Sequence, residues 1–193
     1  MTSTQIEPAP ATPHTVPVHL RHIVLTGFMG AGKTTIGKLL ARQLDWSFLD
    51  LDAHLESRAN ATIPELFDTH GEAHFRRLES SALASALGRP STILALGGGT
   101  PEILTNRLLL EQTPGTLTIF LDAPFETLFD RCVLQGIDRP VLADADAARA
   151  RFLHRQPIYR RLARLTQGTD GQTPEETVAA ILLALKKVPP TRP

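Results

Sequence analysis

The chain alternates between short apolar runs and longer stretches in which apolar residues recur at helical spacing. Short runs rich in Ile, Val, Leu and Thr, bounded by turn residues, are typical of strands buried within a sheet. Such runs predict strands at 22–26, 47–49, 91–96 and 116–121, and a short last strand at 162–166. Strands separated by helix-length segments are the pattern of a parallel α/β sheet.

Helical spacing and capping signals fill the intervals between these strands. Apolar residues between 36 and 44 predict a helix that ends near Asp45. Further helical segments are predicted across 53–88 with breaks near Pro64 and Gly71, from Pro124 onward, on both sides of an interruption at Pro157, and after Thr173. Two segments begin with a capping box, formed by Thr62 with Glu65 and by Thr173 with Glu176.

Length and composition are those of one ordinary globular domain. The 193 residues are 42% hydrophobic and 21% charged, which suffices for one substantial core. We expect a single domain over residues 20–188. Residues 1–19, which are rich in Pro, Thr and Ala, and residues 189–193 are expected to be disordered tails.

The overall charge gives no indication of a polyanionic partner. The formal net charge is zero and the isoelectric point is about 7.1. Cys132 is the only cysteine, which excludes an intramolecular disulfide and favours a reducing compartment. The N-terminal segment lacks the features of a secretory signal, and no apolar run has the length of a membrane span. We expect a cytoplasmic monomer whose partners are small molecules rather than nucleic acid or membranes.

The segment that follows the first predicted strand carries the strongest chemical signal. Residues 27–34, GFMGAGKT, match the phosphate-binding P-loop pattern G-x-x-x-x-G-K-[ST] between a strand and a helix. Backbone N–H groups of such a loop surround phosphates, the lysine reaches the β- and γ-phosphates, and the hydroxyl binds Mg²⁺. The expected nucleotide-binding residues are Gly30, Ala31, Gly32, Lys33, Thr34 and Thr35. The flanking elements disfavour a simple Gly-rich turn.

Acidic residues follow two of the predicted strands. Asp50 and Asp52 stand at the end of the second strand, where open α/β sheets bind ligands. Asp50 can hold Mg²⁺ together with Thr34, and Asp52 can accept a proton from a substrate hydroxyl. The alternative is that both acids only cap the next helix. Asp122 competes with Asp50 as the metal ligand, although Pro124 favours a capping role for Asp122.

Three further features have both a functional and a structural interpretation. Arg76 and Glu79 share one helix face, either for a ligand or as a surface ion pair. The triple glycine at 97–99 allows a ligand to approach the backbone, or forms a flexible turn. Arg139 lies in a loop-like stretch that is either a mobile lid or an ordinary surface loop.

Taken in order, these motifs resemble the shikimate kinase family, and the resemblance extends from about residue 21 to residue 185. It rests on the P-loop, Asp50-x-Asp52, Phe75-Arg76-x-x-Glu79, Gly97-Gly98-Gly99, and Arg139-Pro140 followed by Arg155-x-Pro157-x-Tyr159. The resemblance implies a three-layer P-loop kinase fold, in which helices flank a five-stranded parallel sheet. It also implies a substrate-binding helical region at about 52–88 and a mobile lid at about 134–147.

The resemblance further implies transfer of the ATP γ-phosphate to the 3-hydroxyl of shikimate, in the chorismate pathway to the aromatic amino acids, with Mg²⁺ as cofactor. It implies Lys33, Asp52 and Arg139 as catalytic residues, and Thr34 with Asp50 at the metal. The substrate-binding residues that it implies are Asp52, Arg76, Gly97, Gly98, Gly99 and Arg155. Arg139 and Gln172 are expected to contact the nucleotide.

One departure from the family pattern concerns the adenine. The loop at 168–172, GTDGQ, lacks the arginine that members often carry there, and Arg131 is the alternative side chain beside the base. Another small polyhydroxy-acid kinase, such as a gluconate kinase, is the alternative enzyme. A non-catalytic binding module would be expected to lose Lys33 or the Asp-x-Asp pair, and both are present.

Overall fold

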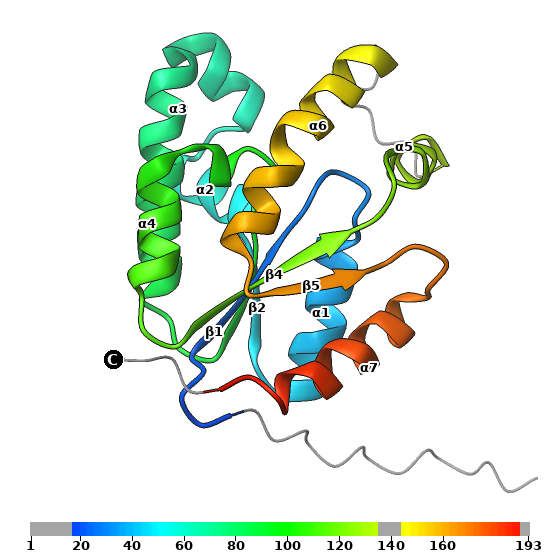
Figure 1. Cartoon of the computed structure of the whole chain (residues 1–193). Coiled ribbons are helices and arrows are strands. Elements are labelled where there is room, and N and C mark those ends of the chain that lie inside the picture. Colours follow the sequence, from blue (N-terminus) through cyan, green and yellow to red (C-terminus); the bar gives the residue numbers. More distant parts are fainter. Residues whose placement is uncertain (1–16, 135–143, 190–193) are drawn as a thin grey trace, which may run out of the picture.

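A five-stranded sheet forms the centre of the computed structural model, which describes residues 17–134 and 144–189. All its neighbouring strands pair in parallel, in the order β2-β3-β1-β4-β5. The strands are β1 (His22–Thr26), β2 (Ser47–Asp50), β3 (Thr92–Ala95), β4 (Thr116–Asp122) and β5 (Leu165–Gly168). The predicted parallel five-stranded α/β fold is confirmed (Figure 1).

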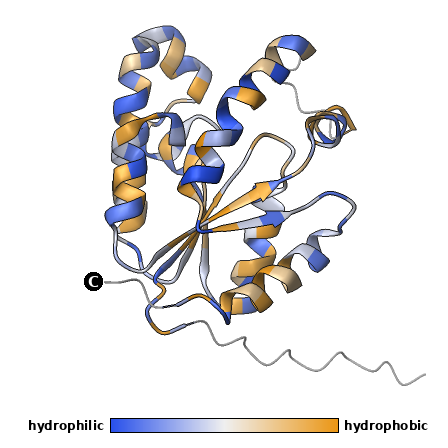
Figure 2. Ribbon diagram, in the orientation of Figure 1, coloured by the Kyte–Doolittle hydropathy of each residue, from blue (hydrophilic) through white to orange (hydrophobic). Residues whose placement is uncertain are grey.

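Helices cover both faces of this sheet. They are α1 (Lys33–Leu44), α2 (Leu51–Ala59), α3 (Ile63–Leu87), α4 (Leu104–Gln112), α5 (Phe125–Leu134), α6 (Ala145–Leu162) and α7 (Pro174–Leu185), with a short 3₁₀ helix η1 (Thr100–Glu102). Ile23 and Leu25 of β1 pack on one face in a cluster with residues of α1 and α7. Val24, between them, points to the opposite face and the cluster of α2, α3 and α4. Because both faces of the sheet are covered, the inner strands β1, β3 and β4 are almost entirely buried. Apolar residues dominate β4, whereas the edge strand β5 carries polar residues (Figure 2).

Local signals account for most helix boundaries. Thr62 caps α3 with the predicted capping box, since its backbone N–H donates to Glu65 Oε2 over 2.7 Å. Gly71 interrupts α3 at φ 74° and ψ 172°, a conformation that other residues rarely adopt. The predicted interruption at Pro157 is wrong, because α6 continues through it. A proline inside a helix costs about 3 kcal/mol, and the burial of Phe152, Tyr159 and Leu162 on the same helix offsets that cost.

The predicted tail and lid boundaries need adjustment. Residues 17–19, assigned to the N-terminal tail, form a turn in which Leu20 N donates to Pro17 O over 2.9 Å. Residue 134 ends α5 and residues 145–147 begin α6, so the edges of the predicted lid at 134–147 are helical. The rest of that lid, 135–143 with Arg139, lies outside the described residues, as do 1–16 and 190–193. Within the described ranges, no helix is both long and apolar enough to cross a membrane.

Buried His22 generates a prediction about stability and pH. Its side chain is 3% exposed, with Nδ1 3.4 Å from Thr116 Oγ1, and burial followed by the charge of Arg21 lowers its pKa. The unfolded chain therefore takes up a proton first as pH falls below about 6.5. The free energy of unfolding should decrease between pH 7.5 and 5.5 because protons favour the unfolded state.

The measurement is urea denaturation followed by circular dichroism across this pH range, for the native chain and for His22→Gln. The variant should lose stability less steeply as pH falls, because this proton linkage is removed. His54, whose pKa is also lowered by burial, contributes to both slopes and cancels in the comparison. Equal slopes would contradict the role given to His22.

Candidate active site

The candidate site lies at the carboxyl ends of three neighbouring strands. The P-loop follows β1, Asp50 ends β2, and the triple glycine follows β3, which pairs with both of the other strands. In open parallel sheets this edge is where ligands bind, because the connections leave a crevice there. The topology therefore brings three sequence motifs to one place.

The P-loop has the backbone that its sequence predicts. Gly32 stands at φ 85° as the N-cap of α1, in the left-handed region that glycine tolerates best, and α1 begins at Lys33. Lys33 Nζ donates to Gly27 O over 2.8 Å and to Phe28 O over 3.0 Å, so the ammonium group lies over its own loop. Gly30 and Ala31 complete the loop, and Thr34 and Thr35 form the first turn of the helix. An anion there faces a helix N-terminus and a nearby cation.

Asp50 performs two tasks with its two carboxylate oxygens. Oδ1 accepts from Asp52 N over 3.2 Å and from Ala53 N over 3.5 Å, which caps α2. Oδ2 accepts from Thr34 Oγ1 over 3.1 Å. The capping and metal-binding interpretations are thus compatible. A hydroxyl and a carboxylate oxygen held together are hard oxygen ligands of the kind Mg²⁺ binds, so these two residues fit that ion.

Each glycine of the triple-glycine segment faces a different predicted substrate-binding side chain. A Cβ placed on Gly97 would lie 2.5 Å from Asp52 Oδ1, and one on Gly98 would lie 3.3 Å from Arg155 Nη1. A Cβ on Gly99 would lie 2.9 Å from Arg76 Nη1. The structure therefore brings one carboxylate and two guanidinium groups, from three separate helices, against this backbone. Space for these groups explains the glycines better than a flexible turn does.

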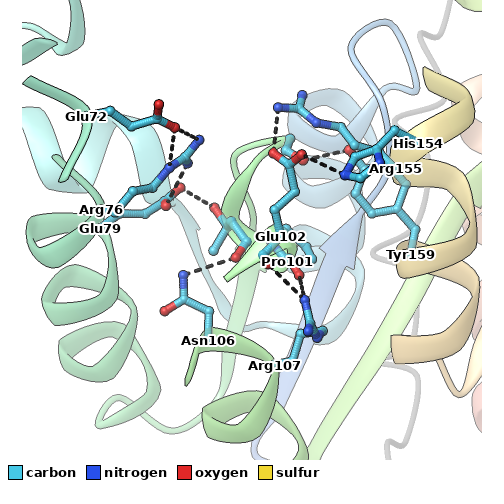
Figure 3. A network of polar contacts seen from close by, with 12 residues as sticks. Glu72, Arg76, Glu79, Pro101, Glu102, Asn106, Arg107, His154, Arg155 and Tyr159 are labelled. Atoms are coloured by element: carbon cyan, nitrogen blue, oxygen red, sulfur yellow. Dashed lines mark hydrogen bonds and ion pairs between the residues drawn. The ribbon is translucent and has the colours of Figure 1, made fainter. Parts of the chain in front are cut away.

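Arg76 is held by two acids of its own helix α3. Its Nη1 lies 3.0 Å from Glu79 Oε2 and its Nη2 lies 3.2 Å from Glu72 Oε1 (Figure 3). Glu79 is 2% exposed and also accepts from Thr100 Oγ1 over 2.7 Å, so this is not an ordinary surface ion pair. Burial opposes the charge of Arg76, but Glu79 and then Glu72 outweigh that effect and raise the pKa of the guanidinium.

Helix α6 supplies the second arginine and anchors the glycine segment. Tyr159 Oη donates to Gly98 O over 2.6 Å, and burial raises the pKa of this phenol. Arg155, one turn earlier, donates from Nη2 to Glu102 Oε2 over 2.8 Å (Figure 3). Residues almost eighty positions apart, Arg76 and Arg155, thus lie beside neighbouring glycines.

Asp122 has partners on helix α6 that its position in the sequence did not indicate. It ends β4, and its Oδ2 accepts from Arg160 Nη2 over 2.8 Å while its Oδ1 accepts from Gln156 Nε2 over 3.3 Å. The carboxylate therefore ties α6 to the sheet. Asp50, which contacts Thr34, is the better candidate for the metal.

Of the predicted site residues that the structure describes, Gln172 is not brought into this cluster. Gln172 makes local contacts, since its Oε1 accepts from Thr177 Oγ1 over 3.3 Å and from Gln167 Nε2 over 3.4 Å. Arg139 lies outside the described residues. Arg131, the alternative side chain for the adenine, donates to Thr169 O over 2.6 Å and lies 3.5 Å from Gly30 O, between the P-loop and the loop before α7.

Sequence reasoning missed Glu102 altogether. This residue ends η1, three positions after Gly99, and no local motif marks it. Its importance comes from a contact with Arg155, fifty-three positions away, which only the tertiary fold creates.

Comparison with known proteins identifies the family to which this geometry belongs. A family model described as shikimate kinase matches residues 29–186. Shikimate kinase from Bordetella pertussis is 42% identical over 180 residues, which span 92% of this chain and 81% of that protein. The solved structure of shikimate kinase from Acinetobacter baumannii in complex with shikimate superposes with a TM-score of 0.80 at 34% identity, over 87% of this chain and 94% of the other.

A second kind of kinase has a more distant likeness. A gluconokinase from Sinorhizobium meliloti superposes with a TM-score of 0.55 but is only 16% identical, so that likeness extends to the fold alone. The family match covers most of the folded chain, from within the P-loop through the other motifs on which the predicted resemblance rests. The chain belongs to the shikimate kinase family.

Proposed function

We propose that this protein transfers the γ-phosphoryl group of ATP to the 3-hydroxyl of shikimate, as a step in the biosynthesis of chorismate and the aromatic amino acids. The observation that carries the proposal is the set of side chains on the triple glycine. Each glycine has one functional side chain close to where its Cβ would be, and these side chains are Asp52, Arg76 and Arg155. The glycines follow β3, the neighbour of the strand that leads into the P-loop. A compact acid with hydroxyl groups has the complementary chemistry, since its carboxylate suits the arginines and its hydroxyls suit the aspartate.

The donor side of the proposed site is the P-loop. Gly30, Ala31, Gly32 and Thr35 are proposed to surround the phosphates with backbone and hydroxyl groups, and Lys33 to neutralise the β- and γ-phosphates. Lys33 already lies over the loop, with its Nζ 2.8 Å from Gly27 O. A small movement of the ammonium group would replace its hydrogen bonds to loop carbonyls with hydrogen bonds to phosphate oxygens. Thr34 and Asp50 are proposed to hold Mg²⁺, which supplies charge neutralisation at the phosphates when bound.

The acceptor side of the proposed site is built around Asp52. This residue lies in the first turn of α2, directly after the capping Asp50, and its carboxylate oxygen abuts Gly97. We propose that Asp52 orients the reacting hydroxyl and takes its proton, while Arg76 and Arg155 bind the carboxylate with Gly97, Gly98 and Gly99 as backbone contacts. Arg139 is proposed to approach the transferring phosphoryl group. Since phosphoryl transfer has a loose transition state, positioning and charge are the main demands on the protein.

The remaining proposals concern the protein as a whole. We propose Mg²⁺ as the cofactor, a cytoplasmic monomer of one domain over 20–188, and no nucleic-acid or membrane partner. The zero net charge supports the absence of a polyanionic partner. Gln172 remains a proposed nucleotide contact through its loop. Another polyhydroxy-acid kinase is the alternative, and a coupled ADP-release assay with shikimate and with gluconate distinguishes the two.

Replacement of Asp52 tests the proposed base. Asp52→Asn should lower kcat by about 10²- to 10⁴-fold, because general-base assistance is typically worth that much. Binding of Mg·ATP, measured by calorimetry, should remain close to native because the P-loop is intact. Asp45→Asn is the matched control, since Asp45 is exposed at the far end of α1 and its left-handed backbone suits asparagine. Near-native kcat in Asp52→Asn would show that Asp52 is not the base.

A side chain at Gly97 should damage catalysis through Asp52. The new Cβ of Gly97→Ala would meet Asp52 Oδ1 at 2.5 Å and force the carboxylate to move. Misplacement by about 1 Å can cost roughly 10²-fold in rate, so we expect kcat to fall by about that factor. Gly98→Ala, whose Cβ would lie 3.3 Å from Arg155 Nη1, should mainly raise KM for the acceptor.

Gly168→Ala is the control for these glycine variants, because no atom lies within 4 Å of its added Cβ. Thermal unfolding confirms that each variant is folded, and steady-state kinetics separates kcat from KM. An unchanged kcat in folded Gly97→Ala would favour a flexible turn without a positional role.

A cycle of two proteins and two acceptors tests the proposed carboxylate contact. The acceptors are shikimate and the analogue in which its carboxylate is reduced to an alcohol. Charge-assisted hydrogen bonds are worth roughly 1.5–3 kcal/mol, so the native protein should prefer the acid by about ten- to a hundred-fold in kcat/KM. Arg155→Ala should show a smaller preference, because the interaction is already lost. The same preference in both proteins would mean that Arg155 does not bind the carboxylate.

A further inference from the structure

Glu102 is held in a defined position directly after the triple glycine. It ends η1, whose backbone is fixed by side chains of α4. Asn106 Nδ2 donates to Thr100 O over 3.0 Å, and Arg107 Nη1 donates to Pro101 O over 2.6 Å and to Glu102 O over 3.0 Å (Figure 3). The backbone from which the Glu102 side chain projects is therefore held by the same hydrogen bonds that support the glycine segment.

The carboxylate of Glu102 lies among the groups proposed to bind the acceptor. Its Oε2 accepts from Arg155 Nη2 over 2.8 Å, and its Oε1 lies 3.7 Å from His154 Nε2. A Cβ placed on Gly99 would lie 3.1 Å from Glu102 Oε2 and 2.9 Å from Arg76 Nη1. Both arginines therefore converge on the volume that one oxygen of Glu102 borders.

Glu102 differs in this respect from the acids that hold Arg76. Glu79 is buried at 2% exposure and accepts from Thr100, so it is a fixed part of the framework. The Glu102 side chain is 24% exposed, and its Oε2 would lie 3.1 Å from a Cβ placed on Gly99. An incoming carboxylate that reaches both arginines meets the negative charge of Glu102 there, and like charges at short range repel.

We propose that Glu102 is an internal carboxylate that occupies Arg155, beside Arg76, until the acceptor's carboxylate displaces it. Glu102 would thereby set how strongly the site prefers an acid over a neutral acceptor. The inference rests on the proposed contact of Arg76 and Arg155 with the acceptor. Arg155 exchanges one charge-assisted hydrogen bond for another when the acceptor binds, so the net gain is smaller than that of a vacant arginine. The binding of every carboxylate ligand is weakened in this way. Only a ligand that makes further contacts, such as hydrogen bonds from its hydroxyl groups to Asp52, then binds well.

Glu102→Gln tests the proposal, because it keeps the shape and a hydrogen-bond acceptor for Arg155 but removes the charge. KM for shikimate should fall by about three- to tenfold, a range that allows for the partial exposure of the pair. KM for the alcohol analogue should change by less than about twofold, so the preference for the acid should increase. This change is opposite in sign to that expected for Arg155→Ala.

Binding without turnover provides a second measurement. Cyclohexanecarboxylate has a ring and a carboxylate but no hydroxyl groups, and calorimetry should show it binding more tightly to Glu102→Gln and Glu102→Ala than to the native protein. Glu126→Gln is the matched control. Glu126 also pairs with an α6 arginine, Arg149, over 2.8 Å, but both side chains are largely exposed and far along the chain from the glycine segment.

The outcomes separate this inference from the proposed function. An unchanged KM for shikimate in Glu102→Gln, or an unchanged affinity for cyclohexanecarboxylate, would overturn the inference. The proposed function would still hold, because it is tested by turnover of shikimate in the native protein. A raised KM would also overturn it and would make Glu102 a residue that positions Arg155. Failure of the arginine assignment would appear separately, as equal acid preference in the native protein and Arg155→Ala.

Discussion

The proposed acceptor side of this protein depends on three consecutive positions without side chains. The segment after β3 lets three helices approach one stretch of backbone, and each brings one functional group, from Asp52, Arg76 and Arg155. Three glycines in a row cost conformational entropy on folding. That cost is offset by anchors on either side, since Tyr159 binds the carbonyl of Gly98 and Asn106 binds that of Thr100. The segment is therefore bare of side chains and yet fixed in position.

The second constraint is electrostatic. Donor and acceptor are both anionic in the proposed reaction, so the site needs cations, and cations held close together repel one another. The structure pairs each arginine that is proposed to bind the acceptor with an internal acid, Arg76 with Glu79 and Arg155 with Glu102. The unequal burial of these two acids gives them different consequences. The buried acid holds its arginine in place, whereas the partly exposed Glu102 is proposed to give way to an incoming carboxylate.

The sequence predicted what depends on local chemistry and periodicity. The strands, the P-loop helix, the capping box at Thr62 and the break at Gly71 all follow from residues within a few positions. The helix at 104–112 was missed, and α6 continues through Pro157 because buried neighbours outweigh the missing hydrogen bond. Arg76 and Arg155 were grouped only by family resemblance. Glu102 was not found, because a contact across fifty-three positions leaves no local pattern.

Asp50 shows how closely the two halves of the site are joined. One of its oxygens contacts Thr34 at the end of the P-loop, and the other caps the helix turn that carries Asp52. A substitution at Asp50 would therefore perturb both halves of the proposed site, because loss of the cap loosens the turn that orients Asp52, the proposed base. Kinetic defects of such a variant would combine a higher Mg²⁺ requirement with a less well oriented acceptor hydroxyl. The proposed donor and acceptor sites are thus connected through a single carboxylate, and no substitution of Asp50 can change one site without affecting the other.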